Sequence, residues 1–374
     1  MRTSLLLAAM VLSLPIDASS QALQPAHTET LEWRLLGPSM PAGRAWTVTG
    51  VESDPKTLYV TTAGGGLWKT TNHGTTFRNV FASYGSASTG AVAVAPSNPD
   101  VVWVGTGEPA NTRANSWGDG VYRSNDGGET WTHMGLRDSY LISRIVVHPT
   151  DPDRVYVAAM GHLWGTNAER GVFRTVDGGR SWEQVLFVND TTGAMDIEMD
   201  PHDPDVLYAG MWQRFRFGGG DMDEAGPGSG IFKSTDGGTT WTRLESGLPT
   251  EDMGKIHLAV ASGNSQIVYA GILTKEPRER AASQTGLYRS DDAGETWSKV
   301  SDPSTGYYYQ QVFVDPSDDE RVYMPVFELR RSEDGGRTWE MVNIRHVHND
   351  LHGMWIDPTD PDHLVIVGDG GVNI

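Results

Sequence analysis

Short apolar runs alternate with turns rich in Gly, Pro and Asp along most of this chain. One recurring unit begins with an apolar strand, turns at a Pro-bearing stretch and continues into a second strand of the type VYVG. It is seen at Ala91–Gly105 (AVAVAPSNPDVVWVG), Ile145–Ala158 (IVVHPTDPDRVYVA) and Ile197–Gly210 (IEMDPHDPDVLYAG). The first strand of this unit occurs seven times, which predicts seven copies of one β-rich element.

A second pattern follows each of the first six copies, in which a strand of the type GVYRS leads into a tight turn and a strand that begins with Thr-Trp. The turn reads SNDGGETW at Ser124–Trp131, recurs in four close copies, and has an altered copy at Thr70–Phe77 (TTNHGTTF). Its third position falls at 72, 126, 177, 236, 292 and 334. Four short strands in roughly 40–55 residues are typical of one propeller blade. The fold class predicted is therefore all-β, a seven-bladed β-propeller of four-stranded antiparallel blades.

The aspartate of this turn is predicted to be structural. A side-chain carboxylate can accept hydrogen bonds from the backbone of its own turn, and the following Gly supplies a positive φ. The Trp then buries a large apolar ring against a neighbouring sheet. Because a catalytic carboxylate is needed once or twice and not in every blade, the repetition itself favours the structural role.

The two ends of the chain carry separate expectations. Arg2 precedes the apolar run Leu5–Leu14, which predicts a signal peptide over 1–22, export to the periplasm or the medium, and a propeller over 23–374. The stretch Leu31–Pro38 (LEWRLLGP) resembles the last strand of a blade, so we expect it to complete blade seven and close the ring. The alternative is that the chain was cut from a longer protein with a second propeller.

The composition limits the kinds of partner that the chain is expected to bind. The net charge of -19 argues against a nucleic-acid partner, which requires basic patches. The absence of cysteine means that an exported form would have no disulfides. No apolar run after the N-terminus is long enough to predict a membrane span. The oligomeric state is left open.

The repeated turn resembles the Asp-box (BNR) repeat of sialidase-like propellers. Together with Gly64–Lys69, Gly105–Glu108 and His348–Asp369, it makes the chain similar to secreted bacterial Asp-box proteins labelled glycosyl hydrolase or sortilin-like. The resemblance implies a fold shared with sialidases, xyloglucanases and the sortilin receptor domain, whose functions differ.

Two activities of these relatives depend on motifs that this chain lacks. Xyloglucanases carry a catalytic Asp in Tyr-x-Arg-Thr-Asp-x-Gly-Gly, but Tyr59–Gly66 reads YVTTAGGG and has Ala63 at that place. The Arg-Ile-Pro motif of sialidases is absent. We therefore favour a propeller that binds a polypeptide or glycan on its loop-rich face, with a glycoside hydrolase as the alternative.

Candidate ligand residues come from the long loops and from one register of the inner strands. Mixed aromatic and charged side chains over a rigid ring suit a sugar or a peptide. Glu108 and Asp196 are the predicted catalytic carboxylates if the chain is a hydrolase. The alternatives are solvated loop charges and hydrogen-bond partners between blades. The predicted ligand-binding residues are Arg44, Trp46, Arg113, Arg144, His162, Trp164, Arg214, His257 and Gln311.

A metal site is the one cofactor hypothesis. His348, Asp350 and His352 alternate in RHVHNDLHGMW, and a strand would place them on one face. Two imidazoles and a carboxylate can bind Zn²⁺ or a similar divalent ion. The alternative is a polar cluster at the channel mouth that bonds across to blade one near Arg44 and Trp46.

Overall fold

The computed structural model describes residues 43–109, 115–217, 222–275, 283–303 and 311–374. Contacts divide the chain into two units, Met1–Met40 and Pro41–Ile374, and all described residues belong to the second. Three expectations lie outside them: the signal peptide over 1–22, the closing strand over 31–38, and the ligand role of Arg113. Among the described residues, no helix is long and apolar enough to cross a membrane.

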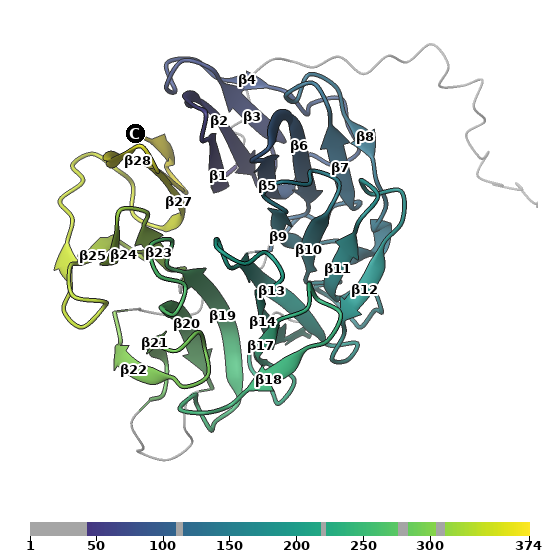
Figure 1. The fold of residues 1–374 in the computed structure, drawn as a ribbon. Coiled ribbons are helices and arrows are strands. Elements are labelled where there is room, and N and C mark those ends of the chain that lie inside the picture. The colour runs from purple at the N-terminus through teal and green to yellow at the C-terminus, as the bar shows by residue number, and fades with distance from the viewer. Residues whose placement is uncertain (1–42, 110–114, 218–221, 276–282, 304–310) are drawn as a thin grey trace, which may run out of the picture. The chain divides into compact units, whose positions relative to one another are not determined.

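Seven antiparallel sheets surround a central channel in this second unit (Figure 1). Within the described ranges six of these sheets have four strands and the seventh has three. In each sheet the strands lie side by side in chain order, apart from the hairpin β15–β16, which is a separate small sheet. Each large sheet is one blade, numbered here from one to seven, and the predicted all-β propeller is confirmed.

The two strands nearest the channel in each blade come first in its sequence. Their bounds are β1 (Ala45–Val51), β2 (Asp54–Thr62), β5 (Thr89–Ala95), β6 (Asn98–Thr106), β9 (Ile142–Val147), β10 (Val155–Ala159), β13 (Thr192–Met199), β14 (Leu207–Gln213), β19 (Met253–Val260), β20 (Val268–Thr274), β23 (Phe313–Asp315), β24 (Asp318–Pro325), β27 (Leu351–Asp357) and β28 (Asp360–Gly368).

The outer strands are mostly shorter than the inner ones. Their bounds are β3 (Leu67–Thr70), β4 (Arg78–Asn79), β7 (Val121–Ser124), β8 (Thr132–His133), β11 (Gly171–Thr175), β12 (Glu183–Leu186), β17 (Gly230–Ser234), β18 (Thr242–Leu244), β21 (Gly286–Ser290), β22 (Ser298–Ser301), β25 (Leu329–Ser332), β26 (Glu340–Met341) and β29 (Gly371–Asn373).

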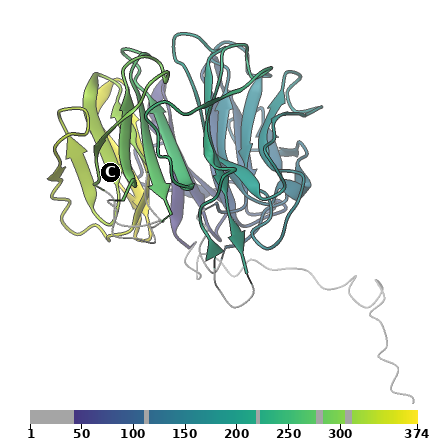
Figure 2. The same ribbon diagram turned by 90° about the horizontal axis from the view of Figure 1, so that it is seen from below.

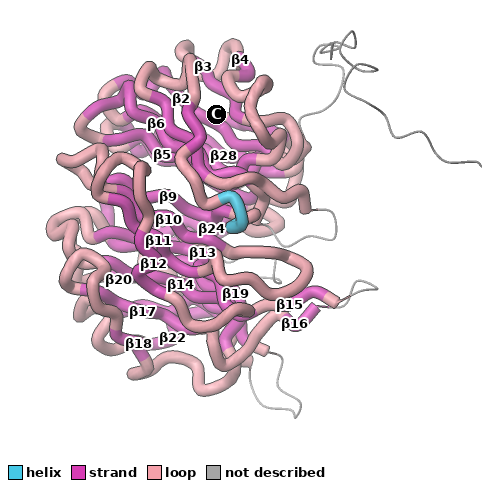
Figure 3. The backbone as a smooth tube through the Cα atoms, turned by 90° about the vertical axis from the view of Figure 1, so that its right-hand side faces the viewer, coloured by secondary structure: helices cyan, strands magenta, loops and turns pink. Residues whose placement is uncertain are grey.

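Two small elements interrupt this regularity (Figure 3). The hairpin of β15 (Phe215–Arg216) and β16 (Met222–Asp223) lies in the loop between β14 and β17 and projects from the ring (Figures 2 and 3). A 3₁₀ turn, Arg137–Ser139, lies between blades two and three.

The antiparallel order gives the ring two different ends. In each blade the connection from the second to the third strand, and the connection to the next blade, leave at one end, here called the loop face. The connections between the first and second strands and the repeated Asp turns leave at the opposite end, here called the turn face. The long loops therefore all lie at the loop face.

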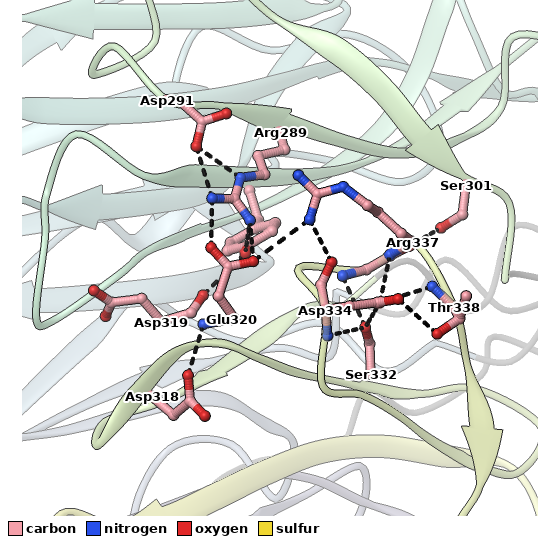
Figure 4. A network of polar contacts seen from close by, with 12 residues as sticks. Arg289, Asp291, Ser301, Asp318, Asp319, Glu320, Ser332, Asp334, Arg337 and Thr338 are labelled. Atoms are coloured by element: carbon pink, nitrogen blue, oxygen red, sulfur yellow. Dashed lines mark hydrogen bonds and ion pairs between the residues drawn. The ribbon is translucent and has the colours of Figure 1, made fainter.

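The repeated aspartates are confirmed as turn residues. In blade two, Asp126 Oδ1 accepts bonds from the Thr130 N–H at 2.8 Å and the Ser124 hydroxyl at 2.7 Å, and Oδ2 accepts from the Thr130 hydroxyl at 2.6 Å. Gly127 has a φ of +65°, which suits a residue without Cβ. Figure 4 shows the same arrangement in blade six, where Asp334 contacts Ser332 and Thr338.

Neighbouring blades are held together by apolar layers and by polar contacts to these turns. Seven buried clusters each join two adjacent blades, and the one that joins blades seven and one includes Val365, Val367, Val48 and Val60. The Tyr59 hydroxyl also donates to the Gly127 carbonyl of the next blade at 2.7 Å. The corresponding bonds elsewhere are Tyr156 to Gly237 and Tyr208 to Ala293, whereas the Tyr269 hydroxyl donates to the Asp319 carbonyl in β24 of the next blade.

Candidate functional site

A buried ion pair lies at the loop face between blades one and two. Arg44 directly precedes β1, and Glu108 follows β6 by two residues. The Arg44 guanidinium donates from Nε and Nη2 to the two oxygens of Glu108, the second bond measuring 2.7 Å. Glu108 is 0 % exposed. Burial raises the pKa of its carboxyl, and the bonds from Arg44 offset only part of this effect.

A second carboxyl group belongs to the same electrostatic cluster. His352 Nε2 donates to Asp369 Oδ1 at 2.7 Å, and this bond holds the pKa of Asp369 below its usual value. The charges of both His352 and Asp369 act on Glu108. The His352 ring lies against Trp46, with 5.1 Å between ring centroids. Blades one, two and seven thus meet in one cluster of two carboxyls, an arginine and a histidine.

Asp369 was not among the residues predicted from the sequence, although a signal for it exists. It directly follows β28, as Ala63 directly follows β2. Ala63 N–H donates to the Arg44 carbonyl and Asp369 N–H donates to the Asp350 carbonyl, each at 3.0 Å, so the two residues occupy equivalent positions. The carboxyl that is missing after the second strand of blade one is therefore present in blade seven.

The four inner-strand candidates line the central channel, below this cluster. Arg144, Asp196, His257 and Gln311 all contact the same cavity. Three of them also form bonds between blades: His257 Nδ1 lies 3.2 Å from Asp196 Oδ2, and Arg144 Nη2 donates to Glu198 at 2.6 Å. All four residues thus line the cavity, and Arg144, Asp196 and His257 also connect blades. Glu198 lies two positions after Asp196 and was not among the predicted residues. Because side chains two positions apart in a strand share one face, the sequence already indicated that Glu198 faces the channel with Asp196.

The two predicted catalytic carboxylates have separate surroundings. Glu108 interacts with Arg44 and with the blade-seven pair, whereas Asp196 interacts with His257, Arg144 and the Leu258 N–H. Burial alone would raise the pKa of Asp196, but the bond from His257 and the charge of Arg144 lower it. Glu108 belongs to the same electrostatic cluster as Asp369.

The loop-face candidates form an aromatic surface over blades two to four. Trp117 stacks on Tyr140 at 6.3 Å between centroids, and Tyr140 stacks on the His162 ring at 3.9 Å. Trp164 lies over the Arg216 guanidinium at 5.7 Å. Trp117 and Trp164 are 67 % and 48 % exposed. Large exposed rings on a rigid scaffold are suited to binding a glycan or peptide.

Arg214 lies beneath this surface and is not a solvated loop charge. Its side chain is buried over the Trp212 ring at 5.5 Å. Burial, followed by the neighbouring charges of Arg170 and Arg216, lowers its pKa to about 9. Its place below the surface suits support of the loops more than direct contact with a ligand.

The predicted metal site is not assembled. The strand begins only at Leu351, and Asp350 has a φ of +67°, so the alternation that would align His348, Asp350 and His352 is absent. His348 is exposed, and its Nδ1 contacts the Asn349 carbonyl. No group of three His, Cys, Asp or Glu side chains among the described residues is arranged to hold a metal ion. The alternative agrees with the structure only for His352, which packs on Trp46, whereas His348 is exposed.

Comparisons with protein families identify the repeat. The model for sortilin, neurotensin receptor 3, matches residues 119–276, and the BNR/Asp-box repeat model matches residues 288–299.

Curated relatives match part of the chain. A xyloglucanase of Acetivibrio thermocellus is 28 % identical over an alignment of 215 positions, which covers 48 % of this chain and 23 % of that protein. A xyloglucanase of Hypocrea jecorina is 30 % identical over 186 residues, 46 % of this chain and 19 % of its own length. The chain thus matches about a quarter or less of the length of these relatives.

Solved structures share the fold. The GH74 xyloglucanase of Xanthomonas campestris superposes with a TM-score of 0.63 at 18 % identity, over 88 % of this chain and 51 % of its own. YCF48 bound to D1 peptide superposes with a TM-score of 0.58 at 14 % identity, over 89 % and 93 %. Identities this low show the propeller architecture alone.

Proposed function

Because the chain is an Asp-box (BNR) repeat β-propeller of the glycosyl-hydrolase type, we propose that it binds a glycan across its loop face and hydrolyses it. The xyloglucanase relatives suggest a branched β-glucan as substrate. They support the hydrolase alternative more than the binding function favoured from the sequence.

The pair Glu108 and Asp369 carries the proposal. Two carboxyls in one cluster whose pKa values are shifted in opposite directions are suited to different roles. Glu108, with its raised pKa, would donate a proton to the leaving oxygen. Asp369, with its lowered pKa, would stay ionised and act as base or nucleophile. His352 would orient Asp369, and the aromatic surface would hold further sugar units.

The test is hydrolysis of xyloglucan, with mixed-linkage β-glucan and carboxymethylcellulose as further substrates. Asp369→Asn should lower the rate by about 100-fold or more, since it removes the ionised carboxylate. Asp362→Asn, an exposed residue at the turn face of the same blade, is the matched control and should keep the rate. Undiminished hydrolysis by Asp369→Asn would contradict the assignment.

One observation favours a second function, binding without hydrolysis. Glu108 is fully buried and both of its oxygens are held by Arg44, so a substrate reaches it only if that ion pair opens. A propeller that retains a glycan or a polypeptide segment on the same face would not need that opening. Affinity electrophoresis in xyloglucan gels separates the two: retardation without any release of reducing ends would establish binding alone.

A further inference from the structure

The central channel is closed at its loop-face end. The Lys255 ammonium of blade five lies 5.7 Å from the centre of the Trp46 ring of blade one, and both side chains are buried. These blades are not neighbours, so their contact spans the channel. Trp46 also belongs to an apolar cluster with Leu141, Met195 and Trp212 of blades three and four. A ligand on the loop face is thereby separated from the channel.

Below this closure the channel forms a cavity of ≈ 490 Å³ lined by the inner strands of all seven blades. Its lining continues to Pro96, Pro316 and Pro358, which lie in turns of the turn face. The cavity therefore opens at the end opposite to the loop-face site. Its volume lies within the range of about 300–1,000 Å³ of small-molecule sites.

One side of the cavity offers hydrogen-bonding groups. His257 is 6 % exposed, and its Nδ1 faces Asp196, which leaves Nε2 as the free ring nitrogen. Neither His257 Nε2 nor Gln311 Oε1 has a hydrogen-bond partner in the part of the chain that the structure describes. Burial lowers the pKa of His257 to about 4, so at neutral pH its Nε2 is an acceptor. Arg144 adds donors from blade three.

The other side is apolar, and carboxyls outnumber cations in the lining. Val92, Val94, Val146 and Trp355 line the wall contributed by blades two, three and seven. The lining also includes the carboxyls of Glu52, Asp196 and Glu198 and one guanidinium, that of Arg144, which pairs with Asp196 and Glu198. An anionic ligand would meet this excess of carboxyls, whereas a neutral one would not.

We propose that the channel is a second binding site, open at the turn face, for a small neutral polyhydroxylated molecule of the size of a monosaccharide or disaccharide. Its hydroxyl groups would donate to His257 Nε2 and Gln311 Oε1 and accept from Arg144. Its C–H faces would pack on the valine and tryptophan wall. This site is independent of the proposed glycan site on the loop face.

The test is calorimetric titration of the whole chain with D-glucose, D-xylose, D-galactose and cellobiose. The wild type should bind at least one of them with a Kd of about 1 mM or tighter. Val94→Trp, which fills the channel, and Gln311→Ala should each weaken that binding by about 10-fold or more, equivalent to about 1.4 kcal/mol. Val176→Trp, which adds the same ring at an exposed position outside the cavity, is the matched control and should retain it, and Asp369→Asn should leave it unchanged.

Three outcomes would overturn the proposal. They are no binding of any probe by the wild type, equal Kd values for the wild type and Val94→Trp, and weakening by Asp369→Asn but not by the channel variants. The last would locate the sugar at the loop face. If only the hydrolysis test fails, sugar binding in the channel can still be confirmed or contradicted by the titration, because the two sites share no residue.

Discussion

Arg289 of blade five forms a two-bond ion pair with Glu320 of blade six, with Nη1–Oε2 at 2.6 Å and Nη2–Oε1 at 2.7 Å (Figure 4). The Arg289 side chain is 6 % exposed, and its guanidinium also contacts Asp291 and the Tyr269 hydroxyl. Arg337 reaches Glu320 from the Asp turn of blade six at 3.6 Å. This network connects one blade to the repeated turn of the next.

Glu320→Ala should lower the free energy of unfolding by about 1–3 kcal/mol, because Arg289 would lose its bidentate partner while remaining buried. Urea unfolding of the two single variants and of Arg289→Met/Glu320→Ala gives the coupling energy. A coupling near zero would show that the pair contributes nothing across the blade interface.

Asp126→Ala should lower Tm by about 2–5 °C and leave ligand binding intact, because turn amides and hydroxyls lose their acceptor. Asp362→Ala, at an exposed position in β28 outside any Asp turn, is the control and should melt like the parent. Lost binding at an unchanged Tm would mean that the repeated aspartate has a functional role after all.

The same turns predict the response of stability to acid. Hydrogen bonds from the residue four positions on hold the pKa values of Asp126, Asp177, Asp236 and Asp334 at about 2. A carboxyl whose folded pKa is depressed contributes stability that is present above its unfolded pKa and is lost as pH falls through the folded one. Tm should therefore fall steeply between pH 4 and pH 2, and calorimetry showing a constant Tm across this window would contradict the structural role of these aspartates.

Trp117→Ala and Trp164→Ala should each weaken glycan binding by about 5–50-fold, since each removes a large exposed ring from the loop face. Val176→Ala, equally exposed but on the Asp turn of blade three, should have no effect. Retardation in xyloglucan gels measures the difference. Equal retardation of all three variants would mean that the aromatic surface does not contribute to glycan binding.

Because of Lys255, the free energy of unfolding should change with pH on the alkaline side of neutrality. Burial lowers its pKa to about 7, so between pH 7 and its unfolded pKa near 10.5 the unfolded chain binds more protons than the folded one. Stability from this group should therefore rise with pH in that window and fall as pH drops toward 7. Lys255→Met should flatten the urea-midpoint profile over this range, and an unaltered slope would show that the amine is not desolvated.

Local patterns were enough to predict the architecture. A turn aspartate bonds to residues at most four positions away, and alternating apolar strands bury one face wherever they occur, so the seven units and the role of Asp126 follow from short stretches of sequence. A ring of Arg144, Asp196, His257 and Gln311 around the channel was one of two alternatives open from the sequence, because they share one register in successive blades; hydrogen bonding between blades was the other.

What the sequence determined by itself is therefore the repeat, the blade and the face on which each inner side chain lies, since these depend on neighbours within one unit. The pairing of Glu108 with Arg44, its proximity to Asp369, and the closure of the channel by Trp46 and Lys255 join residues 64 to more than 200 positions apart. The prediction of a metal site at His348, Asp350 and His352 was wrong because the chain bends at Asp350, where it crosses between blades. The local sequence pattern does not show this bend. Only the closed ring decides which blades face one another and which loop-face groups become buried, and burial in turn sets the pKa values on which the proposed chemistry depends.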